Sequence, residues 1–409
     1  MSERIPITII GGGVIGCAIA YEVSKISRKQ IVLIERNDRI TAENQSSRNS
    51  GVIHAGIYYP KDIEPLKARF CVEGNEMLYR FCEKFEVPHK KTGKIVVANN
   101  SVEEEYLGYV LDIAYDNGVR GIKEISGKEV RRIEPNVNAK SALYIPTSGI
   151  IEPTQLVRKL SVLAQSREVS FLTKRKVTGI NSTKSLFEIT IKSGETEEIF
   201  ETSILINASG VYSNEVAGMV NSDNNNQIRF VRGESAKFYK TRRNDISMNG
   251  SNVYPVPYGF YQDGRKAEVS LEEFKILLKD KKIIKTVGTH LTPTFDFYNN
   301  NYEIGSLVTI GPIPTPVTER DDYSLNLHSE KDYLNKVKKI FPGLKLEDII
   351  LHQSGIQTKI KDEYDFIIER DLKYPTCINL IGIDSPGLTS SLAIARYVSD
   401  LIRSDIKNI

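Results

Sequence analysis

The chain has 409 residues, of which 40% are hydrophobic and 26% are charged. This composition is typical of a globular protein and argues against intrinsic disorder, and the length predicts two or three structural units at roughly 100 to 200 residues each. A formal net charge of +3 argues against nucleic acid as the main ligand. The four cysteines show no C-x-x-C spacing, so we expect no metal site and a reducing, cytosolic compartment.

The first 35 residues show the pattern of a βαβ unit, with strands expected at 5–10 and 31–35 and a helix at 14–26. Between the first strand and the helix lies the motif Gly11-x-Gly13-x-x-Gly16. Its glycines permit a tight turn, close approach of the backbone to a pyrophosphate and close packing of the helix on the strand. Glu35 ends the second strand, where a carboxylate can bind a ribose diol. The motif predicts a dinucleotide and by itself does not separate NAD from FAD.

The middle of the chain changes from α/β to β-rich character. A helix is expected at 154–165 and a short apolar strand at 203–207, closed by the small residues Ala208-Ser209-Gly210. After a polar turn at 221–226, many short β-like runs between 229 and 316 predict a mostly antiparallel sheet. The whole stretch therefore indicates a second domain.

The C-terminal part returns to α/β character. A helix is expected at 331–340 and a strand at 378–383. A last helix is expected to begin near 385–390 and to run to about 402. Ser385 is predicted to cap this helix and Pro386 to occupy its first position, which leaves backbone amides free to face an anion.

The segment SSRNSGVIHAGIYY at 46–59 and the segment LKARFCVEG at 66–74 resemble the FAD-dependent D-amino acid oxidase-like superfamily. Further matches follow in the same order along nearly the entire chain, among them the residues Asn207–Gly210 and the stretch 385–391. Within the superfamily the chain is similar to L-2-hydroxyglutarate dehydrogenases and, at His54-Ala55-Gly56, to flavin-linked glycerol-3-phosphate dehydrogenases. The resemblance implies FAD as the cofactor.

The resemblance also implies a two-domain α/β fold. A Rossmann-like FAD-binding domain would be assembled from residues 1–82, 150–216 and 345–409. A mostly antiparallel β-sheet substrate domain would be inserted as residues 83–149 and 217–344. The α/β ends and the β-rich middle of the sequence agree with this division.

Carried over to matching positions, the resemblance implies a set of cofactor contacts. The glycine turn would contact the pyrophosphate. Glu35 would bind the adenosine ribose, and the Val177 backbone would contact the adenine. The N-terminus of the last helix would face the N1 and O2 edge of the flavin and stabilise its reduced, negatively charged form. The implied cofactor residues are Gly11, Gly13, Val14, Ile15, Gly16, Glu35, Arg36, Ser47, Asn49, Ser50, Gly51, Val177, Ala208, Gly210, Gly355, Pro386, Gly387, Leu388 and Thr389.

Oxidation of an alcohol by FAD needs a base for the hydroxyl proton, and histidine suits this role near neutral pH. His290 is the preferred base because it lies in the predicted substrate domain. His54 is the second candidate, either as a base or as a residue that orients the flavin or attaches to it covalently. The candidate substrate-binding residues are Tyr58, Tyr59, Lys67, Arg232, Tyr254, Gln357 and Lys359, with Arg69 as a further cation.

Gln357 sets the order of the candidate functions. Related enzymes commonly have an arginine at this position, which binds a substrate carboxylate as a bidentate fork. Glutamine lacks that charge, so sn-glycerol 3-phosphate, oxidised to dihydroxyacetone phosphate with Lys359 as a phosphate ligand, becomes the first expectation. The alternatives are an L-2-hydroxyglutarate dehydrogenase or oxidase, an amino acid or amine oxidase of the same fold, and an FAD-binding scaffold or redox sensor without turnover.

The segment 262–285 is rich in lysine and has apolar residues at helical spacing. A basic amphipathic helix of this kind can lie on an anionic membrane or bind a partner, and the alternative is a helix that packs its apolar edge on the same protein. We expect a membrane quinone or a protein partner to accept the electrons, with residues 266–285 as a contact at the inner face of the cell membrane. No transmembrane helix is expected.

Overall fold

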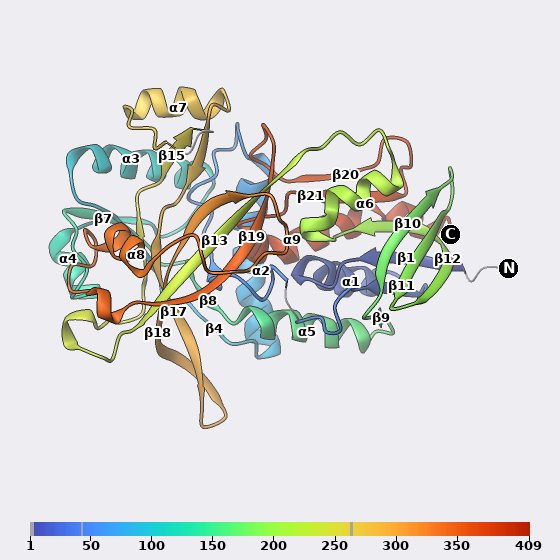
Figure 1. The fold of residues 1–409 in the computed structure, drawn as a ribbon, viewed down its shortest axis with the longest axis horizontal. Coiled ribbons are helices and arrows are strands. Elements are labelled where there is room, and N and C mark those ends of the chain that lie inside the picture. The colour runs from blue at the N-terminus through green and yellow to red at the C-terminus, as the bar shows by residue number, and fades with distance from the viewer. Residues whose placement is uncertain (1–3, 42–43, 262–264) are drawn as a thin grey trace.

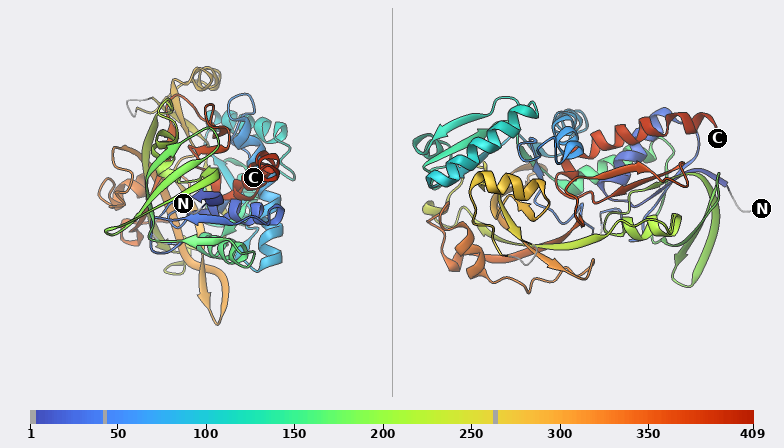
Figure 2. Two further views of the ribbon diagram at one scale, coloured as in Figure 1. Left: turned by 90° about the vertical axis from the view of Figure 1, so that its right-hand side faces the viewer. Right: turned by 90° about the horizontal axis from the view of Figure 1, so that it is seen from above.

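The computed structural model describes residues 4–41, 44–261 and 265–409. Two eight-stranded sheets dominate the fold, and they lie at opposite ends of an elongated molecule (Figure 1). Both termini lie at the end formed by the first sheet, as the two further views also show (Figure 2). The arrangement confirms the predicted α/β fold with a second, sheet-based unit.

The first sheet has a parallel centre with antiparallel margins. Its parallel strands are β1 (Arg4–Ile10), β2 (Ile31–Ile34), β9 (Ser170–Leu172), β12 (Thr196–Asn207) and β21 (Cys377–Ile381). Strands β10 (Lys176–Ser182), β11 (Phe187–Ser193) and β20 (Ile367–Arg370) are antiparallel to their neighbours. Ile7, Ile9, Ile204 and Ile206 are fully buried, as expected of apolar runs in a sheet that is covered on both faces.

Helices from three parts of the chain pack on this sheet. They are α1 (Val14–Ile26), α5 (Pro153–Gln165) and α9 (Gly387–Leu401), with α2 (Pro65–Phe85) packed on α9. Together with the parallel strands they form the largest apolar cluster of the structure. The fold therefore brings the first 35 residues and the last 30 into one unit, although they lie far apart in the sequence.

The second sheet is mostly antiparallel, as predicted. Its strands, in spatial order, are β19 (Ile350–Ile360), β13 (Ile228–Tyr239), β18 (Asn301–Val317), β17 (His290–Tyr298), β14 (Asn252–Pro255), β5 (Lys94–Ala98), β7 (Ser141–Ile145) and β6 (Lys123–Ser126). The pair β14 and β5 is parallel. Strand β19 lies within the segment 345–409 expected for the first unit, but it pairs with β13 and so belongs to the second sheet.

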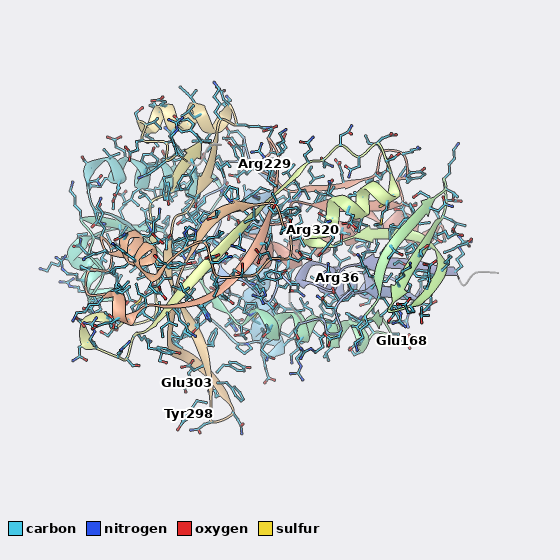
Figure 3. The ribbon with its side chains drawn as sticks, viewed as in Figure 1. Arg36, Glu168, Arg229, Tyr298, Glu303 and Arg320 are labelled. Carbon is cyan, nitrogen blue, oxygen red and sulfur yellow. The ribbon has the colours of Figure 1, made fainter. Side chains whose placement is uncertain are left out.

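Shorter elements complete the fold. The remaining helices are α3 (Ser101–Asp116), α4 (Gly127–Ile133), α6 (Ser213–Val220), α7 (Leu271–Lys279), α8 (Glu330–Val337) and α10 (Arg403–Lys407). Two small sheets are formed by β3 (Val52–Ile53), β8 (Gly149–Ile151) and β4 (His89–Lys90), and by β15 (Tyr258–Tyr261) and β16 (Ile283–Thr286). The hairpin of β17 and β18 projects from the body of the molecule, with Tyr298 and Glu303 near its tip (Figure 3).

The lysine-rich segment 262–285 is partly outside the described residues, because 262–264 are not described. In its described part, α7 buries Phe274 and Leu278, and the Phe274 ring packs against Tyr106 and Tyr109 of α3. The apolar edge of this helix is thus packed on the protein itself, and a contact with a membrane or a partner stays a prediction. Within the described ranges, no helix combines the length and apolarity that a membrane span requires.

Candidate active site

A cavity of about 780 Å³ lies between the two sheets. One part of its wall comes from the ends of β1, β2 and β12 and from the start of α9, and the other from β13, β17, β18 and β19. Residues from both predicted domains therefore meet around one space. Its volume is in the range of natural cofactor and ligand sites.

The turn between β1 and α1 is shaped for a ligand that approaches the backbone. Gly11 and Gly13 line the cavity, and Gly11 has φ +108°. A Cβ atom on Gly11 would lie 2.4 Å from the carbonyl oxygen of Ala208, so β1 and β12 come too close here for any side chain. Gly16, by contrast, does not line the cavity, and its Cβ would lie 1.8 Å from the Gly11 carbonyl oxygen. This glycine therefore serves the close packing of α1 on the turn, and its expected pyrophosphate contact stays a prediction.

Glu35 lies at the end of β2, where the sequence places it. Its carboxylate accepts hydrogen bonds from the backbone N–H groups of Gly12, at 2.7 Å, and Asn37, at 2.8 Å, and it lines the cavity. Each carboxylate oxygen has two acceptor sites, so the group can still bind a diol. Arg36 follows and packs over the Tyr212 ring, which Arg320 also contacts. Both arginines are labelled in Figure 3.

Most of the expected cofactor residues line this cavity, which fits FAD at this site. They are Gly11, Gly13, Val14, Ile15, Glu35, Arg36, Asn49, Ser50, Val177, Ala208, Gly210, Gly355, Pro386, Gly387 and Leu388. Position 355 requires a glycine, because an added Cβ would lie 2.3 Å from the Arg48 carbonyl oxygen. Ser46 was not expected; it lines the cavity and its hydroxyl accepts the N–H of Val14 at 2.8 Å.

Three other expected cofactor residues lie outside the lining. Ser47 donates its hydroxyl proton to the carbonyl of Asn44, and a Cβ on Gly51 would lie 2.5 Å from the Ile151 carbonyl oxygen. Thr389 accepts the N–H of His54 at 3.0 Å through its hydroxyl. These three residues therefore contact neighbouring backbone and do not line the cavity, and their expected cofactor contacts stay predictions.

The N-terminus of α9 faces the cavity without a side-chain cap. The N-cap residue is Pro386, and no side chain within the described ranges accepts the first amides of the helix. Ser385 does not cap the helix, contrary to expectation; its hydroxyl lies 3.4 Å from His54 Nε2. Free amides at a helix N-terminus favour negative charge, so this end suits an anionic ring edge.

His54 and His290 both line the cavity. Burial, together with the charge of Lys94, holds the pKa of each imidazole well below its ordinary value. Both rings are therefore neutral at physiological pH and able to accept a proton. His290 is the first residue of β17, where its ring packs 3.9 Å from the ring of Tyr254, centroid to centroid.

Next to the histidines lies a network of buried charges, which we call the lysine network: Lys67, Lys285, Lys359, Glu64 and Asp384, all lining the cavity. Lys67 Nζ lies 2.8 Å from Asp384 and 3.9 Å from Glu64. Lys285 pairs with Glu64, and Lys359 pairs with Asp384. Asp365 lies behind Lys67, outside the lining, where its carboxylate accepts backbone N–H groups. Three lysines face two carboxylates in this network, and Glu363, which also lines the cavity, pairs with Lys281 outside the lining, so the lysine network carries surplus positive charge.

Lys285 was expected on a surface helix, and the structure corrects this. The residue belongs to β16, and its ammonium donates to the Tyr58 carbonyl inside the cavity wall. Burial lowers its pKa, and the charge of Glu64 opposes that effect. No local pattern marks this lysine, because its neighbours in the sequence are equally basic.

Two expected substrate cations are placed elsewhere by the fold. Arg232 is 2% exposed and pairs with Glu234 at 3.1 Å and Asp322 at 2.5 Å, outside the cavity lining. Arg69 is exposed and pairs with Glu73 at 3.0 Å. Both arginines therefore serve ion pairs and not the substrate.

The remaining substrate candidates fall into two groups. Tyr58, Tyr59, Lys67, Gln357 and Lys359 line the cavity as expected. Tyr254 is fully buried behind His290 and does not line it. We therefore place Tyr254 as a support for the histidine and not as a substrate contact.

Comparisons with known proteins agree with this geometry. A family described as FAD dependent oxidoreductase matches residues 6–401. The chain is 29% identical to the mitochondrial L-2-hydroxyglutarate dehydrogenase of Arabidopsis thaliana, covering 97% of this chain and 83% of that protein. It is 28% identical to a glycerol 3-phosphate dehydrogenase of Caloramator mitchellensis, covering 98% and 75%. Among solved structures, an FAD-bound L-alpha-glycerophosphate oxidase from Mycoplasma pneumoniae has a TM-score of 0.81 at 24% identity, covering 98% of this chain and 95% of that one.

Proposed function

Because the chain belongs to the family of FAD-dependent oxidoreductases and binds FAD, we propose that it oxidises the secondary alcohol of a small anionic 2-hydroxy acid, with L-2-hydroxyglutarate as the first candidate. This order differs from the expectation drawn from the sequence, which put glycerol 3-phosphate first. The similarity to curated proteins named L-2-hydroxyglutarate dehydrogenase supports the change.

The observation that carries the proposal is a neutral histidine beside surplus positive charge. His290 is buried and lines the same cavity as the lysine network. A neutral imidazole can take the hydroxyl proton of an alcohol, and lysine ammonium groups can hold a carboxylate. When bound, FAD supplies the acceptor for the hydride. The chain's own residues thus bind and orient an anion and remove one proton.

Gln357 no longer argues against a dicarboxylate. The missing arginine at this position weakened the hydroxyglutarate interpretation because glutamine supplies no positive charge for a carboxylate. Lys67 and Lys285 bring two further cations to the same cavity. Positive charge for a second carboxylate is therefore present without an arginine fork.

sn-Glycerol 3-phosphate is the second candidate, for a specific reason. Lysines bind phosphate as point charges and do not need the planar fork that suits a carboxylate. The lysine network with Gln357 fits this mode, and the chain resembles a glycerol 3-phosphate dehydrogenase in sequence. The two substrates share the chemistry at the carbon that loses the hydride, and they differ in the anionic group.

Anaerobic bleaching of the bound flavin tests the proposal. We expect L-2-hydroxyglutarate to bleach the flavin of the purified holoenzyme and D-2-hydroxyglutarate to leave it oxidised, because the base and the flavin act on one face of the carbon. Faster bleaching by sn-glycerol 3-phosphate would reverse the order of the two candidates. Bleaching by amino acids alone, or by none of these compounds, would overturn the proposal.

Lys359 offers a test of the anion site. We expect Lys359→Met to raise KM for the anionic substrate about tenfold, since a hydrogen bond to a charged group contributes roughly 1.5–3 kcal/mol. The kcat value should change less, because the lysine does not take part in proton removal. Asp384 keeps its partner Lys67 in this variant, so the fold is expected to persist. Steady-state kinetics on this variant and on Lys361→Met, which changes an exposed lysine just after the end of β19, provide the comparison.

A further inference from the structure

Lys94 is a buried lysine that the proposed reaction does not yet use. It is the first residue of β5 and is 1% exposed. Within the described ranges no carboxylate lies at ion-pair distance from it; its ammonium instead packs 3.8 Å from the ring centroid of Tyr254 and 5.3 Å from that of Tyr58. Burying an unpaired charge costs several kcal/mol, so this lysine lowers the stability of the fold. A buried cation without a counter-ion next to a cleft indicates a functional role.

The position of Lys94 relates it to the two histidines. Tyr254 contacts the side chains of both Lys94 and His290. The centroid of its ring lies 3.8 Å from Lys94 Nζ and 3.9 Å from the centroid of the His290 ring. His54, His290 and Tyr58 line the cavity, whereas Lys94 and Tyr254 do not. Lys94 therefore lies behind the wall that carries the histidines and does not meet the substrate.

We propose that Lys94 is a positioning residue whose positive charge, acting from behind the cavity wall, holds His54 and His290 in their neutral, proton-accepting form. The role of the histidines as bases rests on the proposed function. The electrostatic effect of Lys94 on them does not, since it follows from a buried charge that packs on Tyr254, the ring against which His290 lies.

The charges around the histidines agree with this assignment. Burial, and after it the charge of Lys94, lowers the pKa of His290. The same two causes lower the pKa of His54, and His290 is a third cause there. The other titratable neighbours are neutral: burial raises the pKa of Cys71 to about 12 and raises the pKa of Tyr58 and Tyr254. Lys94 is thus the charged group that acts on both rings.

The pH dependence of this effect has a definite sign. Burial lowers the pKa of Lys94 to about 7. Below this pH Lys94 is charged and repels a proton from the imidazoles, so they stay neutral in the range where a free histidine would protonate. Above it Lys94 is neutral, and the histidines need no such repulsion to stay unprotonated.

The test is the titration of the histidine rings by NMR in the FAD-bound protein. The chain has five histidines, so His54 and His290 can be assigned with His54→Asn and His290→Asn. We expect Lys94→Met to raise the titration midpoints of both rings by about one pH unit, because the variant removes one nearby positive charge that disfavours protonation of the imidazoles. Lys331→Met, which removes an exposed lysine of α8, should leave them unchanged. Unchanged midpoints in folded Lys94→Met would overturn the proposal.

A second measurement covers the case in which Lys94→Met does not fold. In the unmodified protein the ring signals of His54 and His290 should show a further inflection near pH 7, as Lys94 loses its charge. Absence of that inflection would also count against the proposal. Neither experiment uses a substrate, so a failed substrate test and a failed Lys94 test are distinguishable.

The activity of Lys94→Met gives a readout that a merely structural role would not move. The acid limb of kcat/KM should shift to higher pH by the same amount as the histidine midpoints, and Lys94→Arg should restore it because arginine stays charged. A uniform loss at every pH would indicate a packing role and would overturn the assignment.

Discussion

Replacing His290 with asparagine is expected to lower the rate of anaerobic flavin reduction by about a thousandfold, within the range measured for loss of a general base. Asparagine keeps a similar shape but cannot accept the proton of the substrate hydroxyl. Bound FAD should keep its visible spectrum, since His290 lies in the second sheet, away from the glycine turn. Stopped-flow measurement with a saturating 2-hydroxy acid gives the rate.

Two further variants make the His290 result specific. His328→Asn changes a histidine that contacts Thr315 outside the cavity lining and should reduce flavin normally. His54→Asn tests the other neutral ring of the cavity. A loss of less than about tenfold in His290→Asn, together with a large loss in His54→Asn, would move the base to His54.

The lowered pKa of His290 also predicts how kcat/KM depends on pH. Because burial and Lys94 hold the pKa of His290 well below its ordinary value, kcat/KM should stay flat through pH 6.5 and fall only at more acidic pH. If the acid limb of kcat/KM were centred at the ordinary pKa of histidine, the pKa of His290 would not be lowered as its surroundings imply.

Replacing Gly11 with alanine is expected to yield protein with little bound FAD. The glycine has φ +108°, and an added Cβ would lie 2.4 Å from the carbonyl oxygen of Ala208. Backbone strain and overlap each cost about 1–3 kcal/mol, so the turn must shift away from the geometry that cradles the pyrophosphate. The ratio of flavin to protein absorbance after purification, and titration with added FAD, measure the effect; we expect affinity to fall at least about a hundredfold.

Gly108 provides the matched control for Gly11. It lies in α3, where an added Cβ meets nothing within 4 Å. Gly108→Ala should therefore bind FAD normally and gain up to about 1 kcal/mol in stability, because alanine favours the helix. Normal FAD binding by Gly11→Ala would contradict the assignment of this turn as the cofactor cradle.

The sequence alone was sufficient for the elements whose pattern is local. Strand β1, helix α1 and strand β2 match the expected ranges to within about one residue, because apolar periodicity and the glycine motif act over a few turns of chain. The glycine turn and the carboxylate at the end of β2 form one short unit, which predicted a dinucleotide; FAD itself followed from the chain-wide resemblance, and the family match confirms it. The long chain-wide order of motifs then identified the superfamily.

The charged residues show what the sequence did not determine. From the sequence, Arg232 is expected to bind the substrate and Lys285 to lie on a surface helix, yet the fold surrounds Arg232 with two carboxylates and turns Lys285 into the cavity. Thr92-Gly93-Lys94 is a family match in the sequence, but nothing in that match indicates that the Lys94 ammonium is buried against the Tyr254 ring. The role of a charge depends on which counter-charges, rings and solvent surround it, and only the tertiary structure brings those groups together from distant parts of the chain.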